Sequence, residues 1–333
     1  MRKIAIYTTT VLSIFSTAAI AQNQPDSLTT RLRDYVARNF SEARTFNLYW
    51  QTMPTQDYTL HRNGSDYENG ELRDIHYIQF SGTVPIISRN RFSLYANWQT
   101  NFYQFKAQNS VNNGVSSLFH ENEDGYSYHK GTIATTYKGK LFGKPFILNA
   151  NLSGDGWNEG FEKMSGTFSA TMILKSTSTS SFSVGAYGMT LYNEVPVLPI
   201  ISYTNRFASH WILDITMPSR FYVRHDFRGN HRLSAGAQLE SENFYFKPGL
   251  DYLPKTCFYT KETFKPEIVY EYIINEHFYL IARAGGSAVI RGGVYGTDRK
   301  GTDRKGIDRD PLVKVKNPMT PFFNLGISYN IFK

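Results

Sequence analysis

The sequence contains one cysteine, Cys257, among its 333 residues, so it has neither an internal disulfide nor a CxxC metal motif. It also lacks an uninterrupted apolar run of about 20 residues, the length that a membrane-spanning helix requires. No HExxH motif, paired metal spacing or nucleic-acid recognition motif occurs, and Lys and Arg are spread along the chain. These absences exclude a disulfide scaffold and a helical membrane protein. They predict no cofactor, no bound metal and no nucleic-acid partner.

Residues 1–21 have the pattern of a secretory signal peptide. Arg2 and Lys3 precede an apolar centre, and Ala19-Ile20-Ala21 supplies a small-residue cleavage site before Gln22. The apolar centre is too short for a membrane anchor, and the absence of a cysteine after the cleavage site excludes lipoprotein processing. We therefore predict export, with cleavage between Ala21 and Gln22.

What the sequence has in abundance is alternation of apolar and polar residues with a period of two. In residues 209–241, Trp211 and Leu213 belong to an apolar, aromatic phase, whereas Asp214 and Arg224 belong to a charged one. Such alternation is typical of strands with two unlike faces. Aromatic residues make up 15% of a chain whose mean hydropathy is −0.40. This combination is typical of a membrane β-barrel, in which lipid-facing residues alternate with residues facing a wet interior.

We predict an all-β fold, a transmembrane antiparallel up-and-down β-barrel built from residues 43–333. The alternating segments number about fourteen, with twelve as the alternative, because the short segments in residues 200–226 are the hardest to separate. Short and long connections alternate, as in outer-membrane barrels. The long ones are expected at residues 54–71, 106–125, 242–263 and 291–319.

Two further segments lie outside the predicted strands. Residues 22–42 are expected to form a periplasmic segment with a short amphipathic helix, which either caps the barrel end or plugs the lumen. The charged repeat at residues 296–310 cannot bury a core and is expected to be a solvated loop tip.

Charged residues of the polar phase are concentrated in the later strands and are candidates for lining the lumen. A charge on the lipid face costs roughly 2–4 kcal/mol at the bilayer centre for Arg or Lys, so Arg224 is expected to point inward and to lie near Asp214 or Glu240. His225 falls on the lipid phase and is expected at the interface or at a bulge. The candidate set is His210, Asp214, Arg224, Asp226, Arg232, Glu240, Glu267, Glu271 and Arg283.

An enzyme is the least favoured of the functional classes. A hydrolase or acyltransferase needs a nucleophile, a base within hydrogen-bond reach and an orienting group. His225 and Asp226 lie next to each other within a predicted strand and are the pair considered for this role, and no serine or threonine has a nucleophile-elbow context. We therefore predict no catalytic residues.

The chain ends in an alternating segment, residues 326–333, which resembles the C-terminal assembly signal of outer-membrane barrels. It departs from the usual form because Phe332 is on the opposite phase from Tyr329 and is followed by Lys333. The motifs Arg44-Thr-Phe-Asn47 and Pro196-Val-Leu-Pro199, together with Trp211, Pro218 and Tyr222, resemble an uncharacterised outer-membrane barrel family of Bacteroidetes-type Gram-negative bacteria. The resemblance implies a barrel fold and carries no activity to transfer.

The functional prediction is a passive channel or transport-like pore for small polar solutes in the outer membrane. The alternative is a structural or interaction barrel whose lumen is closed by salt bridges. The net charge is +8, or +6 without Arg2 and Lys3 of the predicted leader, and it is expected to meet anionic lipopolysaccharide phosphates. Expected partners are outer-membrane lipid, lipopolysaccharide and the barrel assembly machinery during insertion.

Overall fold

The computed structural model describes residues 44–62, 65–111, 118–119, 125–189, 197–227, 229–297 and 311–331. The predicted signal peptide, the N-terminal helix and nearly all of the charged repeat therefore lie outside the described residues. The described chain forms sixteen strands: β1 (Phe46–Met53), β2 (Gln56–Arg62), β3 (Ser65–Ser88), β4 (Phe92–Val111), β5 (Tyr126–Leu141), β6 (Lys144–Trp157), β7 (Gly160–Ser176), β8 (Ser180–Met189), β9 (Leu198–Arg206), β10 (Trp211–Met217), β11 (Arg220–Asp226), β12 (His231–Phe246), β13 (Cys257–Ile273), β14 (Phe278–Gly296), β15 (Val313–Lys316) and β16 (Thr320–Tyr329).

Fourteen of these strands close into one antiparallel barrel, as predicted. Strands β3 to β14 pair in sequence order, and β1 closes the ring because it pairs with β3 on one side and β16 on the other. The short strands β9, β10 and β11 are all present, so the alternative count of twelve is wrong. Among the described residues no helix has the length and hydropathy to cross a membrane.

An apolar belt surrounds the outer face of the barrel. Its large side chains are exposed and come from the predicted apolar phase, such as Trp98 at 59% and Met217 at 52%. On β12 and β13 the belt ends near Leu239 and Phe264, which lie opposite each other in the register. Beyond that level the same phase of β12 carries Ser241 and Asn243. A closed barrel with an apolar outer band satisfies every backbone group without exposing a strand edge, which is the requirement for crossing lipid.

The two remaining strands, β2 and β15, build a second and narrower barrel at one end of the first. There they take the places of β1 and β16, since β15 pairs with β14 and β2, and β2 pairs with β3. The opposite edge closes where the end of β12 contacts β5. Eight strands, β12 to β15 and β2 to β5, therefore surround this end. A barrel of eight strands is just wide enough for its side chains to fill the interior.

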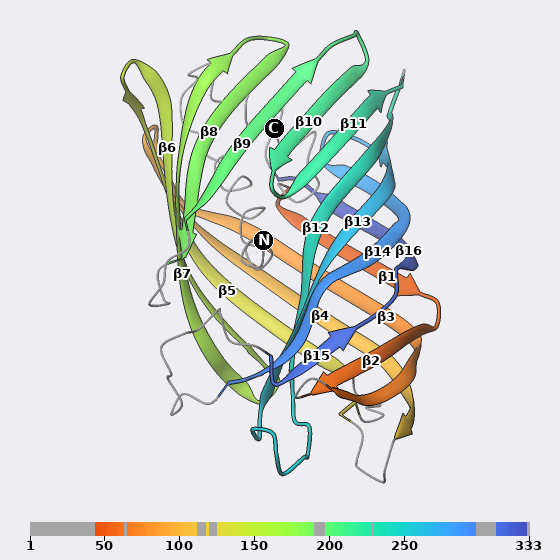
Figure 1. The fold of residues 1–333 in the computed structure, drawn as a ribbon. Helices are drawn as coiled ribbons and strands as arrows, with labels where there is room; N and C mark the ends of the chain where they lie inside the picture. The colour runs from red at the N-terminus through yellow and green to blue at the C-terminus, as the bar shows by residue number, and fades with distance from the viewer. Residues whose placement is uncertain are drawn as a thin grey trace.

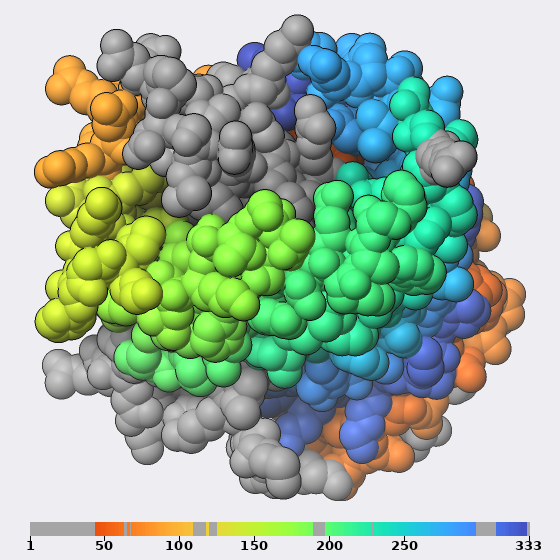
Figure 2. Space-filling view, turned by 90° about the horizontal axis from the view of Figure 1, so that it is seen from above, coloured from red at the N-terminus to blue at the C-terminus, as the bar shows by residue number. Residues whose placement is uncertain are grey.

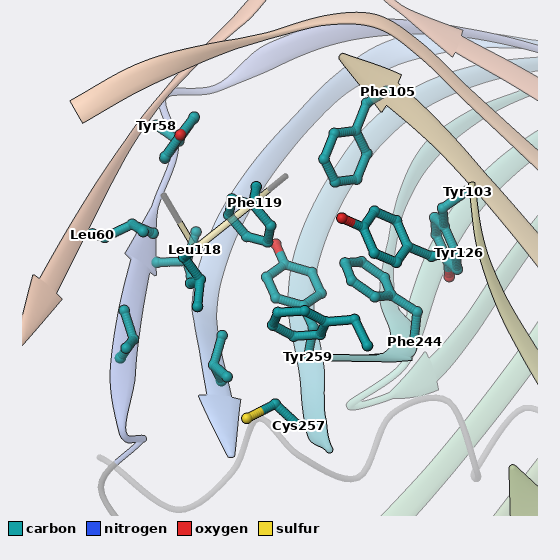
Figure 3. Packing of buried hydrophobic residues seen from close by; sticks show 14 of the residues in the cluster. Tyr58, Leu60, Tyr103, Phe105, Leu118, Phe119, Tyr126, Phe244, Cys257 and Tyr259 are labelled. Carbon is teal, nitrogen blue, oxygen red and sulfur yellow. The ribbon is translucent and has the colours of Figure 1, made fainter. Parts of the chain in front are cut away.

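The interior of this narrow barrel is an aromatic core (Figure 3). Phe244 from β12 stacks on Tyr126 from β5 and on Tyr259 from β13, each with ring centroids 4.6 Å apart. Phe119, from the β4–β5 connection, packs edge-on against Tyr58 and Phe105. We call the eight strand ends and this core the cap, and this end of the molecule the cap end.

The cap corrects the prediction of four long loops. Residues 54–71 and 242–263 are largely strand, because β2 and β3 occupy most of the first range, and only residues 247–256 separate β12 from β13. Likewise β4 continues to Val111, and β14 and β15 lie within residues 291–319. The reason is that the inward phase of these segments changes from polar to aromatic beyond the belt, so the alternation of apolar and polar residues ends although the strands continue.

The barrel wall is shorter at β10 and β11 than at the cap strands, because these two strands end well before the cap end. Strands β10 and β11 have seven residues each and join through Pro218 and Ser219 after a cis Met217-Pro218 bond. Arg220 pairs with Gln238, so β12 continues eight residues beyond the start of β11. In Figure 1 the β10–β11 hairpin turns back in the upper half of the view, whereas β12 continues to the bottom. Figure 2 shows green β7–β11 side by side between yellow β5–β6 and cyan to blue β12–β14.

Candidate lumen site

The inner face of the barrel has two unlike halves. Strands β4 to β9 present small neutral side chains that bond across neighbouring strands, including Thr136 to Asn149 at 2.8 Å and Asn149 to Ser169 at 3.0 Å. Strands β10 to β14 present charged side chains instead. The charged half forms four ion-pair clusters, described in turn below.

The first cluster lies near the end of the barrel where short turns connect the strands, which we call the turn end. Glu271 on β13 accepts from Arg44 Nη2 at 2.5 Å and from Arg232 Nη1 at 3.3 Å. Arg232 Nε also donates to Asp226 at 2.8 Å. The Arg44 guanidinium covers the Tyr279 ring at 3.7 Å. Arg44 directly precedes β1, and its side chain reaches across β16 and β14 to β13. This cluster therefore links the start of β1 to a strand three places away in the barrel.

The second cluster joins β10 to β11. Asp214, 1% exposed, accepts from Arg224 Nη2 at 2.8 Å, and Arg220 Nε lies 3.5 Å from the same oxygen. The predicted contact between Arg224 and Asp214 is thereby confirmed. It arises because both residues belong to the inward phase of adjacent strands.

The third cluster surrounds Lys265 on β13, whose side chain is 1% exposed. Its ammonium lies 2.5 Å from Glu240 Oε2 and 3.4 Å from Glu242 Oε1, and it donates to Gln51 on β1 at 3.2 Å. Glu242 also pairs with Lys261 at 2.8 Å. This cluster stands between the belt level and the cap.

The fourth cluster contains Glu267, which accepts a short hydrogen bond from the Tyr222 hydroxyl and lies 4.0 Å from Arg283 Nη1. The Arg283 guanidinium lies 5.0 Å from the centroid of the Tyr49 ring. Tyr49 and Tyr222 belong to one buried group although β1 and β11 are separated by four strands in the sheet. Side chains from opposite parts of the charged half therefore meet inside the barrel.

Eight of the nine predicted lumen residues take part in these clusters. The exception is His210, which lies exposed in the β9–β10 turn, with its ring 6.2 Å from that of His225. Sequence reasoning missed Arg44, Arg220, Glu242, Lys261 and Lys265. Arg44 was placed at the opening of the first strand but not among the lumen charges, and Glu242 and Lys261 were assigned to a loop, whereas the inward phase of β12 and β13 continues through them.

Burial makes these charges costly to leave unpaired. The side chains of Arg44, Lys265 and Glu271 are exposed by 0–6%, so each relies on its partners rather than on water. Removing one member of a buried pair typically destabilises by about 3–5 kcal/mol because the other charge is left uncompensated. The four clusters can therefore fix the relative positions of β1 and β10 to β14.

A separate buried carboxyl lies just beyond the belt. Glu262 is 4% exposed, and burial raises its pKa to about 7 although Arg291 opposes the shift. Its Oε2 atom has no hydrogen-bond partner among the described residues. This group therefore changes charge near neutral pH.

His225 and Asp226, the pair considered for catalysis, point to opposite faces of β11. The His225 ring packs 4.5 Å from both Trp211 and Phe227, near the turn end, whereas Asp226 pairs with Arg232. His225 pairs in register with Trp211 and Leu233, so no bulge resets the phase at this position, and the interface position stays a prediction. Adjacent strand residues on opposite faces cannot share one substrate.

Another histidine comes closer to a nucleophile. His129 Nδ1 lies 3.1 Å from Thr100 Oγ1, and its Nε2 lies 3.4 Å from Asn158 Oδ1. The orienting group is an amide rather than a carboxylate. Within the described ranges no cluster of His, Cys, Asp and Glu has the arrangement of a metal site.

Comparison with known proteins gives structural likenesses only. No family model matches the sequence, and no curated protein matches it. An outer membrane channel from Pseudomonas putida F1 is similar with a TM-score of 0.37 and 8% identity, over 85% of this chain and 94% of that one. A Pseudomonas aeruginosa FadL homologue gives 0.29 and 8%, over 96% and 97%.

The outer membrane protease OmpT from Escherichia coli gives a TM-score of 0.28 and 9% identity, over 86% of this chain and 96% of that one. These likenesses, all with TM-scores below 0.5, do not transfer an activity. The resemblance to a Bacteroidetes-type family stays a prediction. The strand pairing by itself establishes the described chain as a closed fourteen-strand antiparallel β-barrel.

Proposed function

We propose that this protein is an outer-membrane barrel that lets small polar or anionic solutes pass through its lumen. The observation that carries the proposal is the contrast between the two faces of the closed sheet. The outer face carries the apolar belt, whereas the inner face is polar on both its neutral and its charged half. A barrel with this polarity separates lipid from a hydrophilic interior.

The asymmetry of the two ends supports an orientation in which the cap end faces the cell exterior. Long connections fall at the cap end, and short turns fall at the turn end, which would face the periplasm. In this orientation the belt contacts outer-membrane lipid, and basic residues near its edge meet lipopolysaccharide phosphates. Insertion would require the barrel assembly machinery.

Recording in planar bilayers tests the proposal. Purified protein that migrates as a heat-modifiable band should give discrete conductance steps, and the preference between anions and cations should change when Asp214→Asn is introduced. A protein that is correctly folded by the same gel criterion but gives no conductance in repeated insertions would refute the pore.

The second candidate is a structural or interaction barrel with a closed lumen. It is favoured by the near-complete burial of the ion-pair clusters and by the aromatic core of the cap at one end of the barrel. Such a barrel would be silent in bilayers and would retain a partner during purification. The same recording therefore separates the two candidates. We propose no catalytic function.

A further inference from the structure

Three charged residues stand side by side within the neutral half of the lumen. Lys130 on β5 pairs in register with Asp155 on β6, and Asp155 pairs with Lys163 on β7. All three belong to the inward phase, which continues from them into Thr132, Ser153 and other small polar residues. They therefore form a row across three adjacent strands, at the cap end of the lumen.

The carboxylate in the middle of the row is bonded to tyrosines. Asp155 Oδ1 accepts from the Tyr245 hydroxyl at 2.5 Å, and Oδ2 accepts from the Tyr128 hydroxyl at 3.2 Å. Tyr245 comes from the end of β12, where the cap rests on β5 and β6. Two hydroxyl donors thus fix the direction of the carboxylate and occupy both of its oxygens.

The row carries one more positive charge than negative charge. Cα atoms two strands apart lie roughly 10 Å from each other, since neighbouring strands are about 4.8 Å apart. A lysine side chain spans about half that distance or more, so both ammonium groups can reach one oxyanion held between them. Lysine binds such anions as a flexible point charge with three donors.

The row is placed where a solute would enter. Lys163 belongs to the residues of β7 that point inward, and its side chain is nevertheless exposed. It lies three residues from the short β6–β7 turn. A second contact of the cap, between Lys247 and Glu159 in that turn at 2.7 Å, brings the cap to the edge of the row. Among the described residues, β12 continues eight residues beyond the start of β11, so the barrel wall at β10 and β11 is shorter on the cap side.

We propose that Lys130 and Lys163 form an oxyanion-binding site at the cap-end mouth of the lumen, which takes the carboxylate or phosphate group of a small solute. Asp155, held by Tyr128 and Tyr245, sets the spacing of the two ammonium groups and is a positioning residue. The inference rests on the proposed function, because it names the solute class that the lumen admits.

Binding of inorganic phosphate and of succinate to the purified protein in detergent tests the site without requiring conduction. Titration calorimetry on the full chain should detect both probes. Each ammonium at about 4 Å in water contributes roughly a fivefold gain in affinity, so the double variant Lys130→Gln, Lys163→Gln should bind about 25-fold more weakly. The matched control is Lys140→Gln, Lys175→Gln, which removes two exposed lysines from the opposite ends of the same strands and should bind as the wild type does.

The outcomes distinguish the site from the pore. Equal affinity of the wild type and the Lys130/Lys163 variant, or no binding to the wild type, overturns the site even if the protein conducts. If binding depends on the two lysines but the protein gives no conductance, the site is supported and the pore is refuted. Lipopolysaccharide that displaces phosphate from both the wild type and the Lys140/Lys175 control variant would assign the site to a lipid headgroup and overturn the small-solute proposal.

Discussion

The cap should open when Phe244 is replaced by alanine, while the membrane barrel stays folded. Phe244 is 3% exposed and joins the two edges that close the cap, because its ring stacks on Tyr126 of β5 and Tyr259 of β13. It also lies 5.3 Å from the Tyr103 ring. A buried Phe→Ala change costs about 3–5 kcal/mol, and here the loss falls on the contact between β5 and β12, which no backbone ladder supports.

Cys257 provides a native reporter of that opening. It is 0% exposed within the same aromatic core, and it is the only thiol in the sequence. When local opening is fast, the modification rate of a buried thiol follows the population of the open state. A loss of 3–5 kcal/mol should therefore accelerate the reaction of Cys257 with a water-soluble thiol reagent by about 2 to 3.5 powers of ten, at 1.4 kcal/mol for each factor of ten.

The matched control is Phe161→Ala, which removes the same ring from a position that is 55% exposed at the end of β7. Its thiol reaction should proceed at the wild-type rate, and both variants should keep heat-modifiable migration. A Phe244→Ala protein whose Cys257 reacts no faster than that of the wild type would show that the aromatic core does not hold the cap closed.

Three further predictions concern the charged groups. Asp214→Asn leaves Arg220 and Arg224 buried without their carboxylate, so it should lower the free energy of unfolding in urea by about 3–5 kcal/mol, whereas Asp66→Asn, whose side chain is 63% exposed, should lower it by less than about 1 kcal/mol. Burial raises the pKa of Glu262 to about 7, so the folded state holds the proton more tightly than the unfolded state does. The free energy of unfolding should therefore fall by up to about 3 kcal/mol as pH rises from 4.5 to 7. Glu262→Gln should remove that part of the pH dependence of the unfolding temperature, and an unchanged profile would contradict the assignment. In a Cys257→Ser background, Arg224→Cys, Arg232→Cys and Arg283→Cys should react with a water-soluble thiol reagent and Phe221→Cys with a lipid-soluble one; the reverse preference would mean that inner and outer faces are exchanged.

The period-two alternation was sufficient to predict the barrel and its two faces. Side chains on a strand alternate strictly, so once Trp211 and Leu213 were assigned to lipid, Asp214 had to point inward, and the paired strand carried Arg224 to it. The same reasoning gave fourteen strands, because each apolar phase long enough to cross lipid corresponds to one strand. His210 was misassigned because a turn residue has no phase to inherit.

Tertiary closure decided what the alternation could not. Along β12 the inward phase passes from Arg232 through Glu240 to Phe244, and only contact with β5 turns that last segment into a core rather than a loop. The partners of Lys265 are equally nonlocal, since Gln51 is 214 residues away. The sequence by itself determined which side chains face outward, because the strict alternation along a strand applies one rule to every strand. The contacts among inward-facing side chains depend on how the ring of strands closes and on where the strands are short. Both are properties of all the strands together.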